Sequence, residues 1–549
     1  MKDKIFKSLQ KATGILDVNL EFSSRPEFGD YTTNVALASK NPRSEAEKII
    51  EKLNKDKSLK EIVEKIDIAG PGFINFHLSK GALLSNLAQI LKEKEGYGKS
   101  DVLKAQKLIF EFAHPNTHKA FHIGHLRNVT TGEALSRLTQ AQGAEVIRVN
   151  YQGDVGLHIA KAIWGINKLG FKDPGSMEAR AKYLGEAYVA GSTAYDEDEK
   201  AKEEIIKLNK TLYDKSDKEI DKLYQITRKW SLEYFDSIYK RVDTHFDRLY
   251  FESEVSEIGK KKAENALKKG ILEKSEGAII YKGEEKGLHN RVFINSLGLP
   301  TYEAKDLGLA ELQFSEYKPD KILHIVGPEQ APYFKVIFKV LEEIEPKTKD
   351  REFHIAYGWV RLKEGKMSSR KGNVVLGEWL LDEAKRRIVE KYKTEKETAE
   401  KIAVGAVKYS FLKNGLNQEI AFSLEESISL EGNSGPYLQY TYARTHSVLA
   451  KANKKYKLQD NTTPNREELS VIRYLFRFPE IISIASKNYS PNILAEYLFN
   501  LARVFNTFYN KHKIIGSKEE EFRLVLTSAT GQVLKNGLTL LGIDTAEKM

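Results

Sequence analysis

The sequence predicts a multidomain α/β protein with a parallel sheet at its centre, on three observations. The length of 549 residues suits about three or four domains, and the 41% hydrophobic content allows a sizeable core. Residues 107–150 follow the order strand, loop, helix, strand, which is the βαβ unit of a parallel sheet. From Glu431 onward the hydrophobic pattern is helical to the end of the chain.

The βαβ unit is recognised by changes in hydrophobic period. Residues 107–113 alternate apolar and polar side chains and predict a short strand that carries Glu111 near its end. A loop containing proline and glycine follows, and a helical pattern begins at Leu126. The apolar run 145–150 predicts the next strand. Ligands of such sheets bind at the carboxyl ends of the strands, where helix N-termini offer free N–H groups to phosphate.

Composition excludes several classes of protein. The net charge of +10 and the pI near 9.0 fit a polyanionic partner. The chain has no cysteine, which excludes disulfides, thiolate zinc sites and a cysteine nucleophile. The N-terminus lacks the apolar core of a signal peptide, and no run of about 18 apolar residues could span a membrane. We therefore expect a cytoplasmic protein without membrane contact.

A cluster of histidines allows two interpretations. His114, His118, His122 and His125 lie close together in the predicted loop. Imidazoles there can donate hydrogen bonds to phosphate oxygens. A spacing of four would also place three of the rings on one helix face, which leaves a zinc site open. Proline and glycine argue against that helix, and neither a cysteine nor an HExxH pattern supports it, so we predict no metal site.

Two motifs in this order carry a resemblance to a known family. Residues 122–125, HIGH, match the first signature of class I aminoacyl-tRNA synthetases, and residues 366–370, KMSSR, resemble the second, KMSKS. Each is expected in a loop after a strand. The stretches EFAHPNTHKAFHIGHLRN, NYQGDVGLH and TYEAKD further resemble arginyl-tRNA synthetases, and the similarity extends over nearly the whole chain.

The resemblance implies a domain plan. It implies an α+β N-terminal additional tRNA-binding domain (1–100), a Rossmann-type catalytic domain with helical insertions (101–375), stem-contact helices (376–430) and an all-α anticodon-binding bundle (431–549). It implies an arginine–tRNA ligase that forms arginyl-adenylate and pyrophosphate from L-arginine and ATP. The arginine then passes to the 3′-terminal adenosine of tRNA(Arg), which must be bound before the adenylate forms. We expect a monomer.

The residue types of the matching positions suit arginine. A guanidinium is planar, always charged and carries five donors, so its recognition needs carboxylates in a matching fork beside an aromatic wall. Glu111 and Asp306 can supply the carboxylates, and Tyr302 the wall. Asn116 and Gln330 can bind the α-amino and carboxylate groups. Asp306 could equally cap a helix, and Tyr302 could be a core residue.

The resemblance also assigns the ATP site. It names His122, Gly124, His125, Lys366, Met367, Ser368 and Ser369. Of these, His122, His125 and Lys366 would be catalytic. The second lysine of KMSKS is Ser369 here, and a missing cation at the transition state costs about 10²–10³ in rate unless it is replaced. We favour Lys119 as the replacement over Arg370 or Lys371. Mg²⁺ would accompany ATP without a dedicated protein site.

Candidate tRNA contacts occur at both ends of the chain. Phe73 could stack on a loop base and Asn75 could hydrogen-bond it, although a core position and a turn explain them equally well. Near the C-terminus, aromatic residues alternate with basic ones, which suits stacking plus phosphate contact but also a plain helix bundle. The candidates there are Tyr437, Tyr440, Tyr442 and Arg444.

Further local expectations and alternatives complete the prediction. We expect one strand over 354–362, a helical insertion over 176–250, and an Asp154 side chain that orients a hydroxyl.

A synthetase of another specificity is the nearest alternative function. A cysteinyl enzyme would need thiolate zinc ligands, however, and a glutamyl enzyme would need a cation facing its substrate. A non-catalytic tRNA-binding relative and a generic nucleotidylyltransferase are further alternatives.

Overall fold

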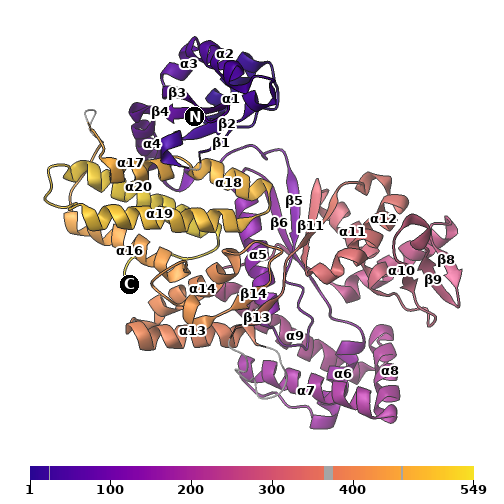
Figure 1. Cartoon of the computed structure of the whole chain (residues 1–549). Helices are drawn as coiled ribbons and strands as arrows, with labels where there is room; N and C mark the ends of the chain where they lie inside the picture. Colours follow the sequence, from indigo (N-terminus) through magenta and orange to yellow (C-terminus); the bar gives the residue numbers. More distant parts are fainter. Residues whose placement is uncertain (24, 364–374, 459–461) are drawn as a thin grey trace. The chain divides into compact units, whose positions relative to one another are not determined.

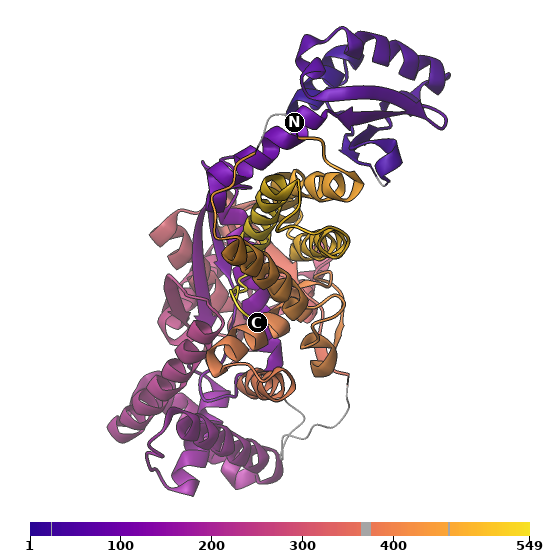
Figure 2. The same cartoon turned by 90° about the vertical axis from the view of Figure 1, so that its left-hand side faces the viewer.

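The computed structural model describes residues 1–23, 25–363, 375–458 and 462–549 (Figures 1 and 2). It divides into two compact units. One unit comprises residues 1–98, 441–480 and 500–536, and the other comprises 99–440, 481–499 and 537–549. Among the described residues, no helix combines the length and apolarity needed to cross a membrane.

The larger unit is built on the predicted parallel sheet. The strands are β5 (Lys107–Glu111), β6 (Glu145–Gln152), β7 (Arg248–Phe251), β11 (Lys321–Val326) and β12 (Glu352–Ala356). Their order is β12-β11-β5-β6-β7, and every neighbouring pair is parallel. The register aligns Glu111 with His324 on one side and with Val149 on the other. The carboxyl ends of three strands therefore meet at Glu111.

Alternating residues of the strands face two different helical layers. Leu108 and Phe110 pack in a cluster with α5 (Ile123–Gln140), α9 (Lys218–Arg241), α13 (Gly377–Tyr392) and α14 (Lys396–Leu412). Ile109 and Val149 pack instead against α10 (Glu252–Lys268) and α11 (Tyr302–Tyr317). The side chain of Glu111, two residues after Ile109, lies on this second face.

Helix α5 begins earlier than the sequence pattern indicates. It starts at Ile123, three residues before Leu126, because His122 caps it. The helix approaches the sheet closely: a Cβ at Gly132 would lie 2.2 Å from Cγ of Phe112. The first signature thus occupies the N-cap and first turn of the helix between β5 and β6, at the carboxyl edge of the sheet.

The helical insertion expected over residues 176–250 is present, and a second insertion lies between α10 and α11. Between β6 and β7 the chain forms α6 (Leu157–Leu169), α7 (Met177–Glu197), α8 (Glu199–Asp214) and α9. Between α10 and α11 it forms the antiparallel strands β8 (Glu273–Ser275), β9 (Ala278–Tyr281) and β10 (Arg291–Ile294). Helix α12 (Ala331–Ile344) follows β11.

The single strand expected over 354–362 is wrong. β12 ends at Ala356, and β13 (Val360–Leu362) pairs with β14 (Ile420–Phe422) in a separate sheet. Gly358 lies between them, where a Cβ would be 2.5 Å from the carbonyl oxygen of Gln418. Only glycine permits this approach, so the chain leaves the main sheet here. The short helix α15 (Leu424–Ser427) follows β14.

The smaller unit contains most of the predicted N-terminal tRNA-binding domain and two segments of the predicted anticodon-binding region. Its antiparallel sheet has the order β1-β2-β4-β3. Its N-terminal elements are α1 (Lys2–Thr13), β1 (Glu21–Phe22), β2 (Tyr31–Thr33), α2 (Pro42–Asn54), α3 (Lys57–Lys60), β3 (Val63–Ala69), β4 (Phe73–Leu78) and α4 (Lys80–Glu93). The C-terminal helices are α16 (Gly435–Ala452), α17 (Arg466–Leu475), α18 (Phe478–Lys487), α19 (Pro491–Lys511) and α20 (Glu520–Leu540), of which only α17 lies wholly in this unit.

Candidate active site

Two histidine rings cap the N-terminus of α5. The backbone N–H of Gly124 donates to Nδ1 of His122 (3.1 Å), and the N–H of His122 donates to Nδ1 of His125 (3.2 Å). The rings stack with centroids 3.8 Å apart. Because each Nδ1 accepts a hydrogen bond, each neutral ring carries its proton on Nε2. Both histidines are therefore held as Nε2–H donors.

The surroundings keep both rings neutral. Burial lowers the pKa of His122, and the nearby Lys119 lowers it further. Burial holds the pKa of His125 well below its usual range, with an added effect from His122. Gly124 is required for the same geometry, since a Cβ there would lie 2.9 Å from Cε1 of His122. The small residue of the signature therefore makes room for a histidine ring.

The loop before the cap is strained and tightly held. Three non-glycine residues have left-handed backbones: Ala113 (φ 83°), His114 (φ 50°) and His118 (φ 62°). Their N–H groups donate to side chains of neighbouring elements: Asn128 Oδ1 (2.5 Å), Asn150 Oδ1 (3.1 Å) and Ser231 Oγ (2.9 Å) respectively. Such strain persists only where the surroundings determine the conformation, and it concentrates at functional sites.

The histidines do not form a metal cluster. Nδ1 of His118 lies 3.1 Å from Thr117 Oγ1 and Nε2 lies 2.8 Å from Thr227 Oγ1, so both ring nitrogens have hydroxyl partners. Burial lowers the pKa of His118 to about 3. Across the described part of the chain, no three His, Cys, Asp or Glu side chains form a group that could hold a metal ion.

Glu111 belongs to a buried chain of charges. Nδ1 of His324 lies 2.9 Å from Glu111 Oε1, and Nε2 lies 2.5 Å from Glu352 Oε2. Gln313 donates to Glu111 Oε2 at 2.6 Å. Burial is the largest single effect and raises the pKa of Glu111, but His324, His114 and Gln313 together lower it further, and the pKa falls to about 2. Burial also opposes a charge on His324, yet the two carboxylates hold its pKa well above the usual range. Glu111 is thus a permanent anion.

Asp306 has a different electrostatic character. It lies on α11 and accepts a hydrogen bond from Tyr333 Oη at 2.7 Å. Burial raises its pKa to about 8 despite this bond. Tyr302, one turn earlier on the same helix, is 56% exposed, and its ring lies 5.2 Å from Nζ of Lys305. Asp306 is therefore a half-buried residue whose carboxyl carries its proton near neutral pH, beside an accessible aromatic ring.

The other predicted site residues lie on the loops of the same edge. Asn116 is half-buried, and a Cβ at Gly153 would lie 2.1 Å from its Oδ1, so this glycine makes room for it. Gln330 is half-buried in the turn after β11. Lys119 is half-buried, with Nζ 5.0 Å from the ring of Tyr188.

Asp154 orients hydroxyl groups of the protein itself. Its buried carboxylate accepts from Ser253 Oγ (2.7 Å), Tyr224 Oη (3.2 Å) and Arg228 Nε (2.8 Å). It therefore ties β6 to α9 and α10. Its Oδ1 accepts from the backbone N–H of Ser253 at 2.9 Å, and the residue is 0% exposed, so Asp154 holds the protein's own groups.

The second signature lies outside the described residues, and so do the predicted site residues Lys366, Met367, Ser368 and Ser369. The chain on either side of it is anchored. Lys363 N–H donates to Phe422 O (2.8 Å), and Ile123 N–H donates to Val375 O (2.8 Å). Gly377 N–H donates to Phe121 O at 2.9 Å. The chain after the second signature is thus hydrogen-bonded to the first.

The buried side chain of Arg127, on α5, binds the chain segments that lie before the second signature and before β14. Its side chain is 2% exposed and donates to the backbone carbonyls of Gly358, Trp359 (2.9 Å), Leu416 (3.1 Å) and Gln418 (3.0 Å). Burial lowers its pKa to about 10. The guanidinium therefore fixes α5 to the segments that lead into β13 and β14.

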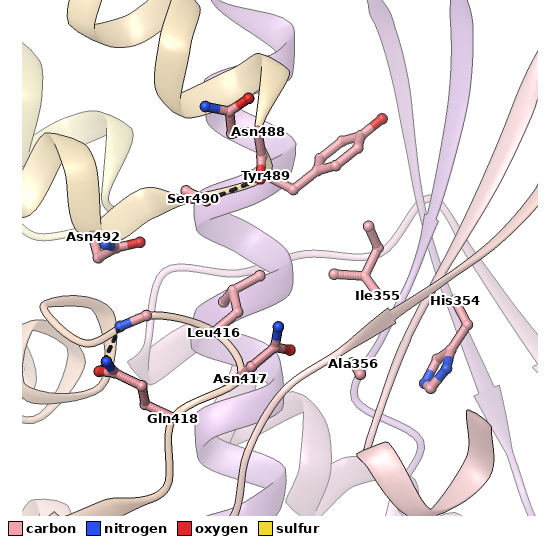
Figure 3. A pocket seen from close by; sticks show the side chains of 11 residues that line it. His354, Ile355, Ala356, Leu416, Asn417, Gln418, Asn488, Tyr489, Ser490 and Asn492 are labelled. Atoms are coloured by element: carbon pink, nitrogen blue, oxygen red, sulfur yellow. Dashed lines mark hydrogen bonds between the residues drawn. The ribbon is translucent and has the colours of Figure 1, made fainter.

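A cavity of about 540 Å³ lies beside these segments (Figure 3). Figure 3 shows amide side chains around it, including Asn417, Asn488 and Asn492. None of the predicted site residues lines it. Its lining includes His354, Ile355 and Ala356 at the carboxyl end of β12, the strand next to β11.

The candidate tRNA contacts of the N-terminal region differ in accessibility. Phe73, at the start of β4, is 37% exposed. Asn75 is 2% exposed, and its Nδ2 donates to Asp67 Oδ1 at 3.3 Å. Asp67 also pairs with Lys65 (2.6 Å) and lies 3.1 Å from Nε2 of His77. In this arrangement Asn75 supports a charged surface group, and Phe73 presents its ring.

The four candidates on α16 are all half-buried. Their exposure therefore lies between that of a surface residue that contacts tRNA and that of a core residue of a helix bundle. Tyr437 packs on the ring of Phe499. Tyr442 stacks on His446 with centroids 6.5 Å apart. Arg444 donates to Asn506 Oδ1 (2.6 Å) and lies 4.7 Å from the ring centre of Tyr509. Their roles toward tRNA stay predictions.

Sequence reasoning missed several polar residues of the pocket. Tyr333 and Gln313 hold the two predicted carboxylates but stand in helical patterns without a motif. Lys305 and Glu252 form a buried ion pair with 2.6 Å between Nζ and Oε2, and the same Nζ lies 5.2 Å from the ring centre of Tyr302. His324 begins the stretch HIVGPEQ (residues 324–330), which ends in the predicted site residue Gln330, and the register places it beside Glu111 in the parallel sheet.

Comparison with known proteins decides the family. Residues 86–424 match the family described as tRNA synthetases class I (R), catalytic domain. The chain belongs to the class I arginyl-tRNA synthetases. Residues 1–78 match the arginyl tRNA synthetase N terminal domain, and residues 438–549 match the DALR anticodon binding domain.

Curated relatives agree with this assignment, and two solved structures share the fold. The arginine–tRNA ligase of Treponema denticola is 34% identical over 97% of this chain and 95% of its own length. That of Borrelia hermsii is 32% identical over 100% and 99%. Thermus thermophilus arginyl-tRNA synthetase has a TM-score of 0.85 at 24% identity and 100% coverage of both chains. The Plasmodium falciparum enzyme has a TM-score of 0.80 at 22% identity, covering 100% and 98%. The two structures support the fold.

Proposed function

We propose that this chain carries out arginine–tRNA ligation in the pocket at the carboxyl ends of β5, β6 and β11. The observation that carries the proposal is the pair of neutral Nε2–H donors on the N-terminus of α5, beside the carboxyls of Glu111 and Asp306 on the same edge. A phosphate and a guanidinium can therefore be held next to each other. Arginine and ATP are the substrates that unite these two groups, and tRNA(Arg) accepts the product.

Arginine recognition rests on the two carboxyls with different pKa values. Glu111 is anionic before the substrate arrives, whereas Asp306 must lose its proton to pair with the guanidinium. Tyr302 offers an accessible ring as a wall, and Asn116 and Gln330 would bind the α-amino and carboxylate groups. A substrate without the guanidinium fork would leave a buried carboxylate unpaired, which costs on the order of 2–4 kcal/mol.

Activation needs positioning and charge stabilisation but no covalent enzyme intermediate. The arginine carboxylate attacks the α-phosphate of ATP in line; a C–O–P linkage forms, and the bond to pyrophosphate breaks. Nε2–H of His122 and of His125 would donate to the phosphate oxygens, and the positive end of the α5 dipole favours the same charge. Lys366 would reach the pyrophosphate from the second signature, and Gly124, Met367, Ser368 and Ser369 complete the proposed ATP site.

Lys119 is our candidate for the cation that Ser369 does not supply. Its ammonium lowers the pKa of His122, of His125 and of His158, so it lies close to the phosphate donors. Mg²⁺ enters the proposal only as the ion that accompanies ATP. The described residues offer it no three-ligand protein site, and no step passes through a protein-bound metal.

The tRNA would bind along both terminal regions before adenylate formation. The proposed contacts are Phe73, Asn75, Tyr437, Tyr440, Tyr442 and Arg444.

We also propose that the chain divides into four domains, with boundaries near residues 100, 375 and 430. We propose that it is a monomer and that it lies in the cytoplasm, where tRNA is charged. A non-catalytic relative is disfavoured because both capping histidines are present with their Nε2–H groups available.

ATP–pyrophosphate exchange tests the function. We expect exchange with arginine alone among the amino acids, and only when tRNA is present, because tRNA must bind first. Exchange with arginine in the absence of tRNA would retain the substrate and remove the coupling. Absence of exchange with every amino acid, alongside retained tRNA binding, would instead indicate the non-catalytic relative.

Replacement of Lys119 tests the substitute cation. Lys119→Ala should lower kcat of exchange about 10²- to 10³-fold, since one transition-state contact is lost. The KM for arginine should change little. Lys104→Ala, an exposed lysine of the same unit, serves as control. An unchanged kcat in Lys119→Ala would remove Lys119 from the mechanism and return attention to Arg370 and Lys371.

The raised pKa of Asp306 predicts a pH-dependent affinity. Its pKa of about 8 means that the free carboxyl is largely protonated at pH 7 and ionised above pH 8. Only the ionised form pairs with a guanidinium. The KM for arginine should therefore rise about tenfold for each pH unit below the pKa, and Asp306→Asn should show a high KM without this dependence. A constant KM between pH 6.5 and about 8.5 would contradict the assigned role.

A further inference from the structure

Tyr151 lies on the sheet face that carries the arginine carboxylates. It follows Val149 by two residues on β6, and Val149 is aligned with Glu111 on β5. Successive side chains of a strand alternate between faces, so Glu111, Val149 and Tyr151 share one face. Tyr151 also packs at the edge of the cluster formed by this face with α10 and α11. Its ring is thus in the layer between the sheet and Asp306.

The hydroxyl of Tyr151 has no partner within the described residues. The oxygen is buried and makes no hydrogen bond, although the ring as a whole is half-buried. Oε1 of Gln313, the residue that holds Glu111, is a second buried atom without a partner on the same face. A buried polar group normally finds a partner, and an unsatisfied one costs free energy. An unpaired hydroxyl oxygen and an unpaired amide oxygen on the face that carries the two carboxyls both have lone pairs free, which indicates a missing group rich in donors.

The surrounding charge identifies the kind of group. Burial raises the pKa of Tyr151 well above its usual range, and Glu252, Asp306 and Glu111 raise it further. The hydroxyl therefore stays protonated among acidic side chains. Its lone pairs are available to a cation with several N–H donors, which is the pattern of a guanidinium. A guanidinium carries five N–H donors in one plane, so it can pair with a carboxylate and still donate to a neutral oxygen.

We propose that Tyr151 is a further specificity-determining residue, whose hydroxyl accepts a hydrogen bond from the guanidinium of the substrate. This inference rests on the proposed arginine pocket. The sequence assigns Tyr151 no role of its own. It lies in the stretch NYQGDVGLH between Asn150, which accepts from the strained loop, and Asp154, which binds α9 and α10. It adds a neutral acceptor to the two carboxyls and so favours a planar, many-donor cation.

Tyr151→Phe is the direct test, because it removes the oxygen and keeps the ring. In exchange assays with tRNA present, the KM for arginine should rise about 10- to 100-fold, as expected for loss of a hydrogen bond to a charged group. The KM for ATP and kcat should stay within about twofold, because the contact forms in the ground state. Inhibition by agmatine, which has the guanidinium but no carboxylate, should weaken by a similar factor.

Tyr250→Phe is the matched control. Tyr250 is the register neighbour of Tyr151 on β7, but its hydroxyl donates to Glu316 at 2.8 Å. This variant should leave the KM for arginine unchanged. An unchanged KM and unchanged agmatine inhibition in Tyr151→Phe would overturn the inference. Loss of arginine-dependent exchange in the wild-type chain would instead overturn the proposed function.

A second pair of variants keeps the test decisive if Tyr151→Phe melts well below the wild type. Tyr151→Gln and Tyr151→Met have similar length, but only glutamine offers an acceptor oxygen. The glutamine variant should bind arginine at least about fivefold more tightly than the methionine variant, as one weak hydrogen bond gives. Equal affinities would contradict the proposal.

Discussion

The hydrogen bonds at the N-terminus of α5 constrain the whole candidate site. A helix begins with backbone N–H groups that need acceptors, and here two imidazole rings supply them. That arrangement fixes the tautomer of both rings and requires glycine at position 124. The strained loop before the cap, the buried Arg127 behind it and the chain around Val375 are all hydrogen-bonded to this region or its neighbours. The capping of α5 thus fixes the positions of the two Nε2–H groups that we propose donate hydrogen bonds to phosphate.

Buried charge shapes the second half of the site. Glu111 is kept ionised by His324, whose other nitrogen meets Glu352, whereas burial keeps Asp306 protonated near neutrality. An empty pocket with two permanent carboxylates side by side would be costly, because like charges repel strongly where water is excluded. A proton on Asp306 removes that cost until a cationic substrate arrives. The same logic explains why a neutral hydroxyl, that of Tyr151, can stand among acidic groups.

Much of this arrangement could be predicted from the sequence, because it depends on local pattern. The strand–loop–helix–strand unit, the helical insertion and the C-terminal helices follow from hydrophobic period. The start of α5 was missed because histidine is not among the usual capping residues. The break at Gly358 was missed because it depends on a backbone approach to Gln418, sixty residues away in the sequence.

Contacts between distant segments set the limit of sequence reasoning. The partners of Glu111 and Asp306 come from β11, α11 and α12, and no spacing rule connects them. Motif matches could name the carboxyls but not their protonation. Protonation depends on burial and neighbouring charge, which exist only in the folded chain.

The most direct test of the account is the protonation state of the two capping histidines. Nuclear magnetic resonance of the protein with ¹⁵N-labelled histidine, with His122→Asn and His125→Asn used for assignment, reports each ring nitrogen separately. The account predicts that at pH 7 both rings are neutral, with an unprotonated Nδ1 and a protonated Nε2. An imidazolium signal, or a proton on Nδ1 of either ring, would contradict the capping geometry and the phosphate donors derived from it.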